Sequence, residues 1–571
     1  MHKNIDLNKI YERISIATGL DDNKIKSKID EEELYLLMSN LLNSNGISSQ
    51  EDIDLYINRP WDAFISPYRL TNAEKCADKI IEYINKKNGY IYVYADYDVD
   101  GIVSGTLAHR LLDKHTLGNF EIIFPNREDG YGLSEIFCEK IIKRHSKVDD
   151  VLVITVDNGI TKIKETNMLI ENGIEVLITD HHKSDEEVGV PNCIVVDPHN
   201  DYEEQDENTK HLCGAGVFFK VSQIIKEKLG DDSILSDVPY VALATVADVM
   251  PITSENNAFM VYALEMINSD VAEGFFSLLK DQLDCNFITA EQFLWNIGPA
   301  LNACGRLGYT RKGAEALINP CIDTFNEVLR INDDRKAVTK GFKKRVEEME
   351  SDDKIIIHIA DKSYCPKGTL GILAGNIAEK KNRPAMALLN TDGICHGSVR
   401  SANGIDVYKI LTELKEEGLI LKCNGHSQSC VCEFDINNYD KIVEAINNLD
   451  INSYALEELD EKEEQILDIT LDHLCDIVYA LGCILCIDGK TIKSNYVINN
   501  LTIDSFSVSK NNPANIKLKL RDGRRVRTMW AWGIADKVLD VIESTNIINL
   551  IGNIKKNMMG YGYVLDITDV Y

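Results

Sequence analysis

The chain has 571 residues, of which 44% are hydrophobic and 27% are charged. That length exceeds what one hydrophobic core supports and predicts three or four domains of a soluble globular protein. The net charge of -30 argues against broad electrostatic capture of nucleic acid, but a nucleic-acid enzyme can still use bound metal ions or a local basic surface. No segment reaches the roughly 18 uninterrupted apolar residues of a membrane span. The 15 cysteines follow no framework spacing, so we expect a cytoplasmic protein that has no membrane partner.

Residues 1–88 form an acidic, helix-rich segment that we expect to cap the domain that follows. From there to about residue 200, apolar runs of strand length alternate with segments of helix length. This alternation predicts an α/β domain with a doubly wound, mostly parallel sheet. The five predicted strands span residues 90–95, 121–125, 151–156, 175–179 and 193–197.

Metal-ligand residue types follow three of these strands. The first strand runs into Asp96 and Asp98, the third into Asp157, and the fourth into the pair His181 and His182. Because the carboxyl ends of parallel strands lie at one edge of the sheet, we expect these side chains to lie close together. Carboxylates with one or two imidazoles suit Mn²⁺ or Mg²⁺. The sequence therefore predicts a site for two divalent ions, whereas any one of these motifs taken alone is equally typical of a polar turn.

Three further polar residues are less clear from their surroundings. Asp100 lies past the end of the first strand, where the chain turns into a helix, so we assign it to the turn or to a position behind the metal ligands, and not to the metals themselves. Asp248 follows an apolar helical run and is either a metal ligand or a helix-end residue. The segment GPALNACGR is predicted to be a glycine-rich loop that ends in Arg306, which can bind a phosphate or form a surface salt bridge.

A second, smaller α/β unit is predicted over residues 353–450, after a long charged connecting helix over 321–352. Within the smaller unit, HGSVRS presents Ser398 and Arg400, and NGH presents His426, each on a predicted glycine turn. Each segment can be an ordinary turn. Together, the three side chains are typical of the wall of an anion site.

Residues 466–571 contain many short strand-like runs, which predict a small OB-like β-barrel. One part of this segment combines cations with tryptophans, as a groove for single-stranded nucleic acid requires. The alternative is a solvated hairpin with tryptophans in its core. The residues concerned are Lys517, Lys519, Arg521, Arg524, Arg525, Arg527, Trp530 and Trp532.

The motifs occur in a distinctive order between about residues 70 and 435: DYDVDG, NREDGYGL, VDNG, DHH, HLCGAGV, ADVMP, GPALNACGR, LGILAGNIAEK, HGSVRS and NGH. In this order they resemble the RecJ family of single-strand-specific 5′→3′ exonucleases, within the DHH/DHHA1 phosphoesterase superfamily. The resemblance implies a DHH catalytic domain over residues 89–320, a DHHA1 domain over 353–450 that binds phosphate and nucleic acid, and a C-terminal OB fold.

The resemblance also implies a role for each matching residue. Asp96 and Asp157 are expected to hold one ion, and Asp157 is expected to bridge to a second ion held also by Asp98, His181 and Asp248. The expected catalytic residues are Asp157, Asp180 and His182, with His182 at the scissile phosphate or the leaving group. Phosphates of single-stranded DNA, including the 5′ end, are expected to contact Arg127, Arg306, Ser398 and Arg400, with His426 nearby.

The implied activity is hydrolysis of single-stranded DNA from the 5′ end in DNA repair, recombination or replication. A single-strand-binding protein or a helicase is a candidate partner. The alternatives are a nano-RNA or cyclic-dinucleotide phosphodiesterase of the same superfamily and an inactive scaffold like the replication factor Cdc45. Asn424 and Val399 stand where the family usually has glycine, and both departures concern end recognition. Such divergence is consistent with a phage or prophage version.

Overall fold

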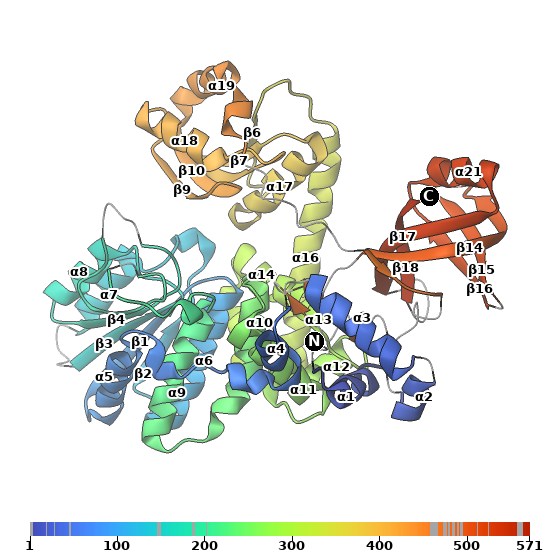
Figure 1. Ribbon diagram of the computed structural model, residues 1–571. Helices are drawn as coiled ribbons and strands as arrows, with labels where there is room; N and C mark the ends of the chain where they lie inside the picture. Colours follow the sequence, from blue (N-terminus) through green and yellow to red (C-terminus); the bar gives the residue numbers. More distant parts are fainter. Residues whose placement is uncertain are drawn as a thin grey trace. The chain divides into compact units, whose positions relative to one another are not determined.

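The computed structural model describes most of the chain (Figure 1). Arg524, which the sequence places in the basic cluster, lies outside the described residues. The described residues are 4–18, 20–27, 29–44, 47–145, 150–184, 189–200, 202–456, 466–471, 477, 480–481, 486–487, 490–491, 495–510, 512–523, 525–556 and 563–571.

The chain divides into two compact units built from interleaved segments. The first unit comprises residues 1–74, 203–297 and 462–571, and the second comprises residues 75–202 and 298–461. Residues 203–297, which the sequence assigns to the catalytic domain, thus group with the two ends of the chain. The predicted domain boundaries stay predictions.

The second unit contains the predicted parallel sheet, in the order β2-β1-β3-β4-β5. Every neighbouring pair is parallel, and the predicted strands and fold class are confirmed. The strands are β1 (Gly89–Ala95), β2 (Phe120–Ile123), β3 (Asp150–Val156), β4 (Glu175–Thr179) and β5 (Ile194–Val196). They are nearly all apolar because helices cover both faces of such a sheet.

Helices lie on opposite faces of this sheet because neighbouring residues of a strand point in opposite directions. Tyr94 of β1 belongs to the core that also contains Phe137 of α7 (Glu135–His145) and Leu169 of α8 (Ile163–Glu171). Gly105 of α6 (Val99–His115) lies against the next residue, Ala95. The helix that follows the DYDVDG motif therefore packs on the other face.

A second sheet follows the predicted connecting helix, which is confirmed as α16 (Ile322–Glu347). Its order is β6-β7-β8-β10-β9, with only the first pair parallel. Its strands are β6 (Ile356–Ala360), β7 (Ala385–Thr391), β8 (Ile394–Arg400), β9 (Lys422–His426) and β10 (Ser429–Asp435). The other helices of this part are α14 (Gly298–Arg306), α15 (Thr310–Ile318), α17 (Leu370–Lys381), α18 (Val407–Glu416) and α19 (Tyr439–Asn448).

Three glycine-containing segments were predicted as loops or turns, and this prediction is wrong. GPALNACGR forms helix α14, HGSVRS lies mainly in strand β8, and NGH ends strand β9. A Cβ on Gly305 would lie 2.1 Å from the Tyr97 carbonyl oxygen, and one on Gly397 would lie 2.0 Å from the Ala387 carbonyl oxygen. These glycines permit close packing of backbones and do not mark turns.

The first unit combines the helical N-terminal segment, a second helical segment and the C-terminal strands. The N-terminal helices are α1 (Leu7–Thr18), α2 (Asp22–Lys26), α3 (Glu31–Ser44) and α4 (Gln50–Ile53). The second segment contains α9 (Gly214–Leu229), α10 (Val238–Ala247), α11 (Ser254–Asn268), α12 (Leu279–Gln282) and α13 (Ala290–Gln292). Across the described residues, every helix is too short or too polar to cross a membrane.

The C-terminal strands close into a ring. β14 pairs with β15, β15 with β16, β16 in parallel with β18, β18 with β17, and β17 again with β14. Helix α21 (Ala535–Ser544) connects β16 to β17. This arrangement is compatible with the expected OB-like barrel. Its strands are β14 (Asn495–Val508), β15 (Ile516–Asp522), β16 (Arg525–Ala531), β17 (Ile547–Lys556) and β18 (Tyr563–Val570).

Candidate metal centre and phosphate pocket

The DYDVDG motif forms the junction between β1 and α6. Asp96 follows the strand and is only 2% exposed, while Asp98 is the N-cap of the helix and accepts a hydrogen bond from the Gly101 N–H at 3.2 Å. A Cβ on Gly101 would lie 2.5 Å from the Asp96 carbonyl, so only glycine permits this turn. The motif thus places two carboxylates at the carboxyl end of the first strand.

The ends of β3 and β4 are tied together by backbone contacts. Asp157 adopts a positive φ of 61°, and its N–H donates to the Thr179 carbonyl at 2.9 Å. The side chain of Asn158 donates to the Tyr94 carbonyl at 3.1 Å, which links β3 to β1. Asp157 is 1% exposed. The three strand ends that the sequence predicts at one edge are therefore brought together.

Two overlapping groups of donor atoms form a candidate metal centre. The carboxylates of Asp96, Asp98 and Asp157 have ligand atoms within 4.8 Å of one another, as do Asp157, His181 and His182. Among the described residues, the Oδ1 atoms of Asp96 and Asp157 are buried without a hydrogen-bond partner. Asp157 belongs to both groups. Its bridging position between two ions stays a prediction.

The electrostatics of this cluster favour a bound cation. Burial raises the pKa of Asp96 well above its usual range, and the charge of Asp98 adds to the rise. Burial likewise raises the pKa of Asp157, with the carboxylates of Asp100 and Asp98 as the next causes. Buried carboxylates that repel one another gain from a positive charge between them. Oxygen and imidazole donors in this setting fit a divalent metal ion.

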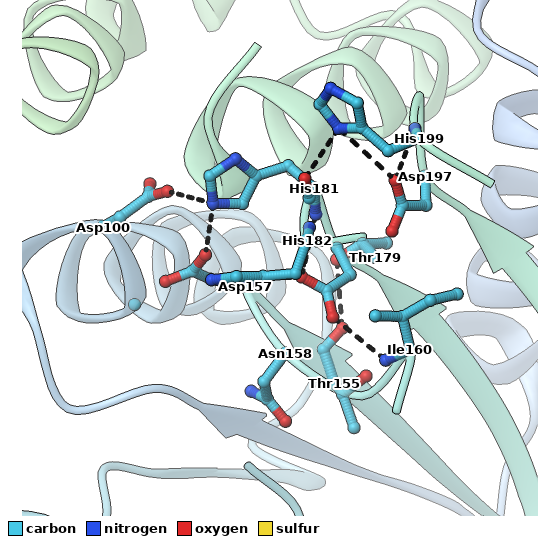
Figure 2. A network of polar contacts seen from close by, with 12 residues as sticks. Asp100, Thr155, Asp157, Asn158, Ile160, Thr179, His181, His182, Asp197 and His199 are labelled. Carbon is cyan, nitrogen blue, oxygen red and sulfur yellow. Dashed lines mark hydrogen bonds and ion pairs between the residues drawn. The ribbon is translucent and has the colours of Figure 1, made fainter. Parts of the chain in front are cut away.

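Asp100 lies beside the predicted metal ligands, as the second of its two expected positions allows. It lies in the first turn of α6 as expected, but it is only 2% exposed, and its Oδ2 is 3.6 Å from Nε2 of His181. The same Nε2 is 3.3 Å from Oδ1 of Asp157, and Figure 2 shows the three side chains pointing toward one another. The signal for this position in the sequence was the regular spacing of Asp100 after Asp96 and Asp98. Because the chain changes from strand to helix at this point, the direction of the Asp100 side chain could not be predicted.

Asp180 organises the histidine pair instead of facing the metals. Its Oδ1 accepts the N–H groups of His181 at 2.8 Å and His182 at 3.2 Å, and the ring Nδ1–H of His182 at 2.7 Å. Its Oδ2 accepts the Ile160 N–H at 3.0 Å. Burial opposes ionisation of Asp180, but His182 and these donors outweigh it and lower the pKa to about 2. In addition, the ring of His199 donates to the His181 carbonyl at 2.7 Å (Figure 2).

A pocket of about 470 Å³ lies beside this cluster within the second unit. Arg127, Lys367 and Lys422 supply positive charge to it, and Ser398 supplies a hydroxyl. The guanidinium of Arg127 lies 4.3 Å from the ring centroid of Tyr97. The lining residues are Tyr97, Arg127, Gly130, Tyr131, Lys367, Leu370, His396, Gly397, Ser398, Lys422, Asn424, Gly425, Val431, Cys432 and Glu433.

The predicted phosphate-binding arginines gather near this pocket. Burial lowers the pKa of Arg306 to about 10, with the charges of Arg127 and Arg400 as further causes. Burial also lowers the pKa of Arg400, and Arg127 contributes to the effect. A Cβ on Gly371, near the start of α17, would lie 2.7 Å from Nη2 of Arg400 and 3.5 Å from Oγ of Ser398. Buried like charges beside a helix N-terminus favour an anionic ligand.

Val399, which stands where the family usually has glycine, lies in the hydrophobic core and not in the pocket. Val399 is completely buried in the apolar cluster on one face of the second sheet, paired with Met386 of β7 and Cys430 of β10. Ser398 precedes it on the strand and lines the pocket. Two other predicted residues belong to different elements: His426 is exposed at the end of β9, and Asp248 is the C-cap of helix α10 in the first unit. Their predicted roles stay predictions.

The basic cluster of the barrel has an exposed side. Lys517, Lys519 and Arg521 alternate with buried residues along β15, and Lys517 lies opposite Trp530 of β16. The Trp530 and Trp532 rings stack with centroids 5.0 Å apart. Arg521 forms two hydrogen bonds to Asp504 at 2.9 and 2.6 Å. Arg525 and Arg527 lie on β16, mostly or partly exposed.

Comparison with known proteins identifies the families of two parts of the chain. The DHH family, N-terminal domain, matches residues 90–246, and the DHHA1 domain matches residues 352–449. The single-stranded-DNA-specific exonuclease RecJ of Bacillus subtilis (strain 168) is 25% identical over 523 residues. The match covers 88% of this chain and 63% of that relative, so the chain spans less than two thirds of its length.

Two further comparisons extend this finding. A putative SPbeta prophage-derived single-strand DNA-specific exonuclease, YorK of B. subtilis (strain 168), is 26% identical over 431 residues, which cover 68% of this chain and 70% of YorK. This relative fits the expected phage version. The crystal structure of RecJ from Thermus thermophilus in complex with Mn²⁺ aligns with a TM-score of 0.69 and 20% identity, over 94% of this chain and 77% of that chain. It shows a shared fold.

Proposed function

We propose that this chain, which matches the DHH and DHHA1 family models and is similar to RecJ, is a metal-dependent exonuclease that hydrolyses single-stranded DNA from the 5′ end. The observation that carries the proposal is the adjacency of the donor cluster and the basic pocket. Tyr131 belongs to both, because it lines the pocket and its hydroxyl is 3.0 Å from Nδ1 of His182. A phosphate held in the pocket thus lies beside the groups needed for hydrolysis.

The proposed cofactors are two Mn²⁺ or Mg²⁺ ions. Asp96, Asp98 and Asp157 would hold one, and Asp157 with His181 would contribute to the other, because their donor atoms are grouped and partly unpartnered. Asp98 is thus assigned to the first ion, whereas the resemblance implied the second. Bound there, divalent ions supply activation of water and stabilisation of the charge that develops on a phosphodiester. The buried carboxylates of the chain fix where such ions can lie.

The remaining residues bind and orient the strand. His182 presents its Nε2 to the scissile phosphate or the leaving oxygen, because Asp180 engages the opposite ring nitrogen. Arg127, Ser398 and Arg400 neutralise and hold the phosphate of the 5′ end. We place this activity in cytoplasmic DNA repair, recombination or replication, where a single-strand-binding protein or helicase supplies the single strand.

Digestion of end-labelled DNA tests this function. Single and double strands labelled at the 5′ or 3′ end are incubated with Mn²⁺ or Mg²⁺ and the wild type or Asp157→Asn. The proposal expects mononucleotides from the 5′ end of single strands only, and at least about 100-fold slower release by Asp157→Asn. Asp113→Asn, which changes an exposed carboxylate of α6, serves as the matched control.

Three outcomes of this digestion would contradict the proposal. Release from 3′ ends only would give the opposite polarity. Cleavage confined to dinucleotides would favour a small-substrate phosphodiesterase. No cleavage together with no Mn²⁺ binding by calorimetry would favour an inactive scaffold.

A further inference from the structure

Tyr131 occupies a defined position between the pocket and the histidine pair. It lies between Gly130 and Gly132, which adopt positive φ values of 96° and 68°. Two positive φ values in three residues impose a sharp backbone path that few residues other than glycine adopt. This path directs the tyrosine side chain to His182, where its hydroxyl oxygen lies 3.0 Å from Nδ1.

The hydrogen on Nδ1 of His182 can be assigned from its other partner. Oδ1 of Asp180 lies 2.7 Å from Nδ1 and also accepts the backbone N–H groups of His181 and His182. A carboxylate oxygen that accepts these bonds requires Nδ1 to carry the hydrogen. The Tyr131 oxygen therefore shares this hydrogen as a second acceptor. Nε2 is the ring nitrogen left for the substrate.

Ring contacts restrain the same group from a second direction. The Tyr131 ring meets the His182 ring edge-on, with centroids 5.5 Å apart and planes at 73°. It meets the Tyr97 ring at 6.4 Å and 77°, and Arg127 lies over Tyr97. A continuous set of packed rings thus connects the arginine of the pocket to the histidine of the donor cluster. Asp180 and the Tyr131 hydroxyl both contact Nδ1 of His182, and the Tyr131 ring restrains the imidazole by a separate edge contact.

We propose that Tyr131 is a positioning residue for His182, and that its hydroxyl, together with Asp180, fixes the ring so that Nε2 faces the scissile phosphodiester. This inference rests on the proposed nuclease function. Tyr131 acts through His182 and not through the metal ligands or the affinity for the strand. Its removal therefore affects turnover and leaves substrate and metal binding unchanged.

The test uses Tyr131→Phe in the full chain, which removes one oxygen and keeps the ring. We expect kcat on 5′-phosphorylated single-stranded DNA to fall about ten-fold, the effect of one lost hydrogen bond to a reacting group. KM and the Mn²⁺ affinity measured by calorimetry should remain those of the wild type. Tyr364→Phe is the matched control, since it removes the hydroxyl of another tyrosine–histidine pair, with His358 at 2.8 Å, outside the pocket lining.

A double-mutant cycle separates positioning from a general structural effect. His182→Ala alone should lower kcat by about 100-fold or more, as loss of a proton-transfer group does. In the His182→Ala background, Tyr131→Phe should have no further effect, because the group it positions is gone. An equal ten-fold loss in both backgrounds would overturn the inference. So would wild-type kcat for Tyr131→Phe, or a change in KM or Mn²⁺ affinity alone.

Failure of the inference is distinguishable from failure of the proposed function. If the wild type degrades the strand and Tyr131→Phe matches it, only the positioning role is wrong. If the wild type degrades no labelled strand, the proposed function fails and the positioning role fails with it.

Discussion

Asp100 shows how a single side chain changes the interpretation of the candidate metal centre. Its Oδ2 lies 3.6 Å from the imidazole of His181, and its charge is the second cause, after burial, of the raised pKa of Asp157. We predict that Asp100→Asn weakens Mn²⁺ binding by about 10- to 100-fold, because a carboxylate that contacts a metal ligand contributes charge and orientation. Calorimetric titration with Mn²⁺ measures the effect.

The control for this experiment is Asp113→Asn, since Asp113 is an exposed carboxylate on the same helix. Its Mn²⁺ affinity should equal that of the wild type. Wild-type affinity for Asp100→Asn as well would support the assignment of Asp100 to the turn and remove it from the metal centre.

A buried ion pair lies within the helical part of the first unit. Lys220 of α9 pairs with Glu255 of α11, both at most 2% exposed, and Lys220 also donates to the Ile65 carbonyl at 2.6 Å. We predict that Lys220→Met lowers the free energy of unfolding by about 3–5 kcal/mol, because it leaves the Glu255 carboxylate buried and unpaired. Urea denaturation followed by circular dichroism measures this loss.

Lys228→Met provides the comparison for that buried pair. Lys228 pairs with Glu74 at 2.9 Å, with the two side chains 29% and 55% exposed, so its removal should cost less than about 1 kcal/mol. Similar losses for the two variants would show that burial does not set the strength of the Lys220 pair.

At the scale of elements, the sequence predicted the parallel strands well and the glycine-containing segments poorly. The five apolar runs became strands because their length and composition suit a sheet covered on both faces. In GPALNACGR and HGSVRS, local composition suggested loops. The close approach of Gly305 to Tyr97 and of Gly397 to Ala387 shows instead that distant segments demand these glycines. Such contacts have no signal in a single sequence.

The residues of the candidate site also divide into those whose positions the sequence could predict and those whose positions it could not. Asp96, Asp157 and His181 were predictable, because each follows a predicted strand of one sheet and parallel strands place such residues at one edge. The direction of Asp100 was not predictable, because it depends on where the strand stops and α6 begins. The role of Tyr131 was also concealed, because its partner His182 is 51 residues away in the chain.

Strand β8 places a core residue and a pocket residue next to each other. Val399 is completely buried, whereas its neighbour Ser398 lines the pocket. We predict that Val399→Gly, the residue usual in the family, lowers the free energy of unfolding by about 2–4 kcal/mol through a cavity and a more flexible strand. KM for a 5′-phosphorylated strand should remain unchanged. Urea denaturation and steady-state kinetics measure the two quantities.

Ser398→Ala should show the opposite pattern in the same assays. It removes a hydroxyl from the pocket and no apolar packing, so stability should stay within about 0.5 kcal/mol while KM rises. A change of KM with wild-type stability for Val399→Gly would show that this position does take part in end recognition.

At the scale of the whole molecule, net charge and proposed substrate are in apparent conflict. A chain with a net charge of -30 repels a polyanion at distances where its charges act together. Salt reduces that repulsion to a range of about 8–10 Å, so binding depends on local groups. The pocket around Arg127 and the exposed side of β15 are two such basic surfaces.

Salt dependence of binding tests whether the barrel is one of these surfaces. Among the described residues, Lys517 and Lys519 form no ion pair, and Lys517 lies 5.7 Å from the Trp530 ring centroid. We predict that Lys517→Ala with Lys519→Ala lowers the slope of log affinity against log salt by about 1.4, or about 0.7 for each lost phosphate contact of a single strand. Fluorescence anisotropy with labelled oligo(dT), without divalent metal, measures the slope.

Arg521→Ala is the matched control on the same strand. Asp504 already neutralises its guanidinium through two hydrogen bonds, so its removal releases few counterions and should change the slope by much less. Equal slopes for the lysine variant and the wild type would remove β15 from the DNA-binding surface. That result would favour the alternative of a solvated hairpin, but with Trp532 outside its core, because Trp532 is 48% exposed. Stacked tryptophans without nearby cations leave the repulsion of an acidic chain unopposed.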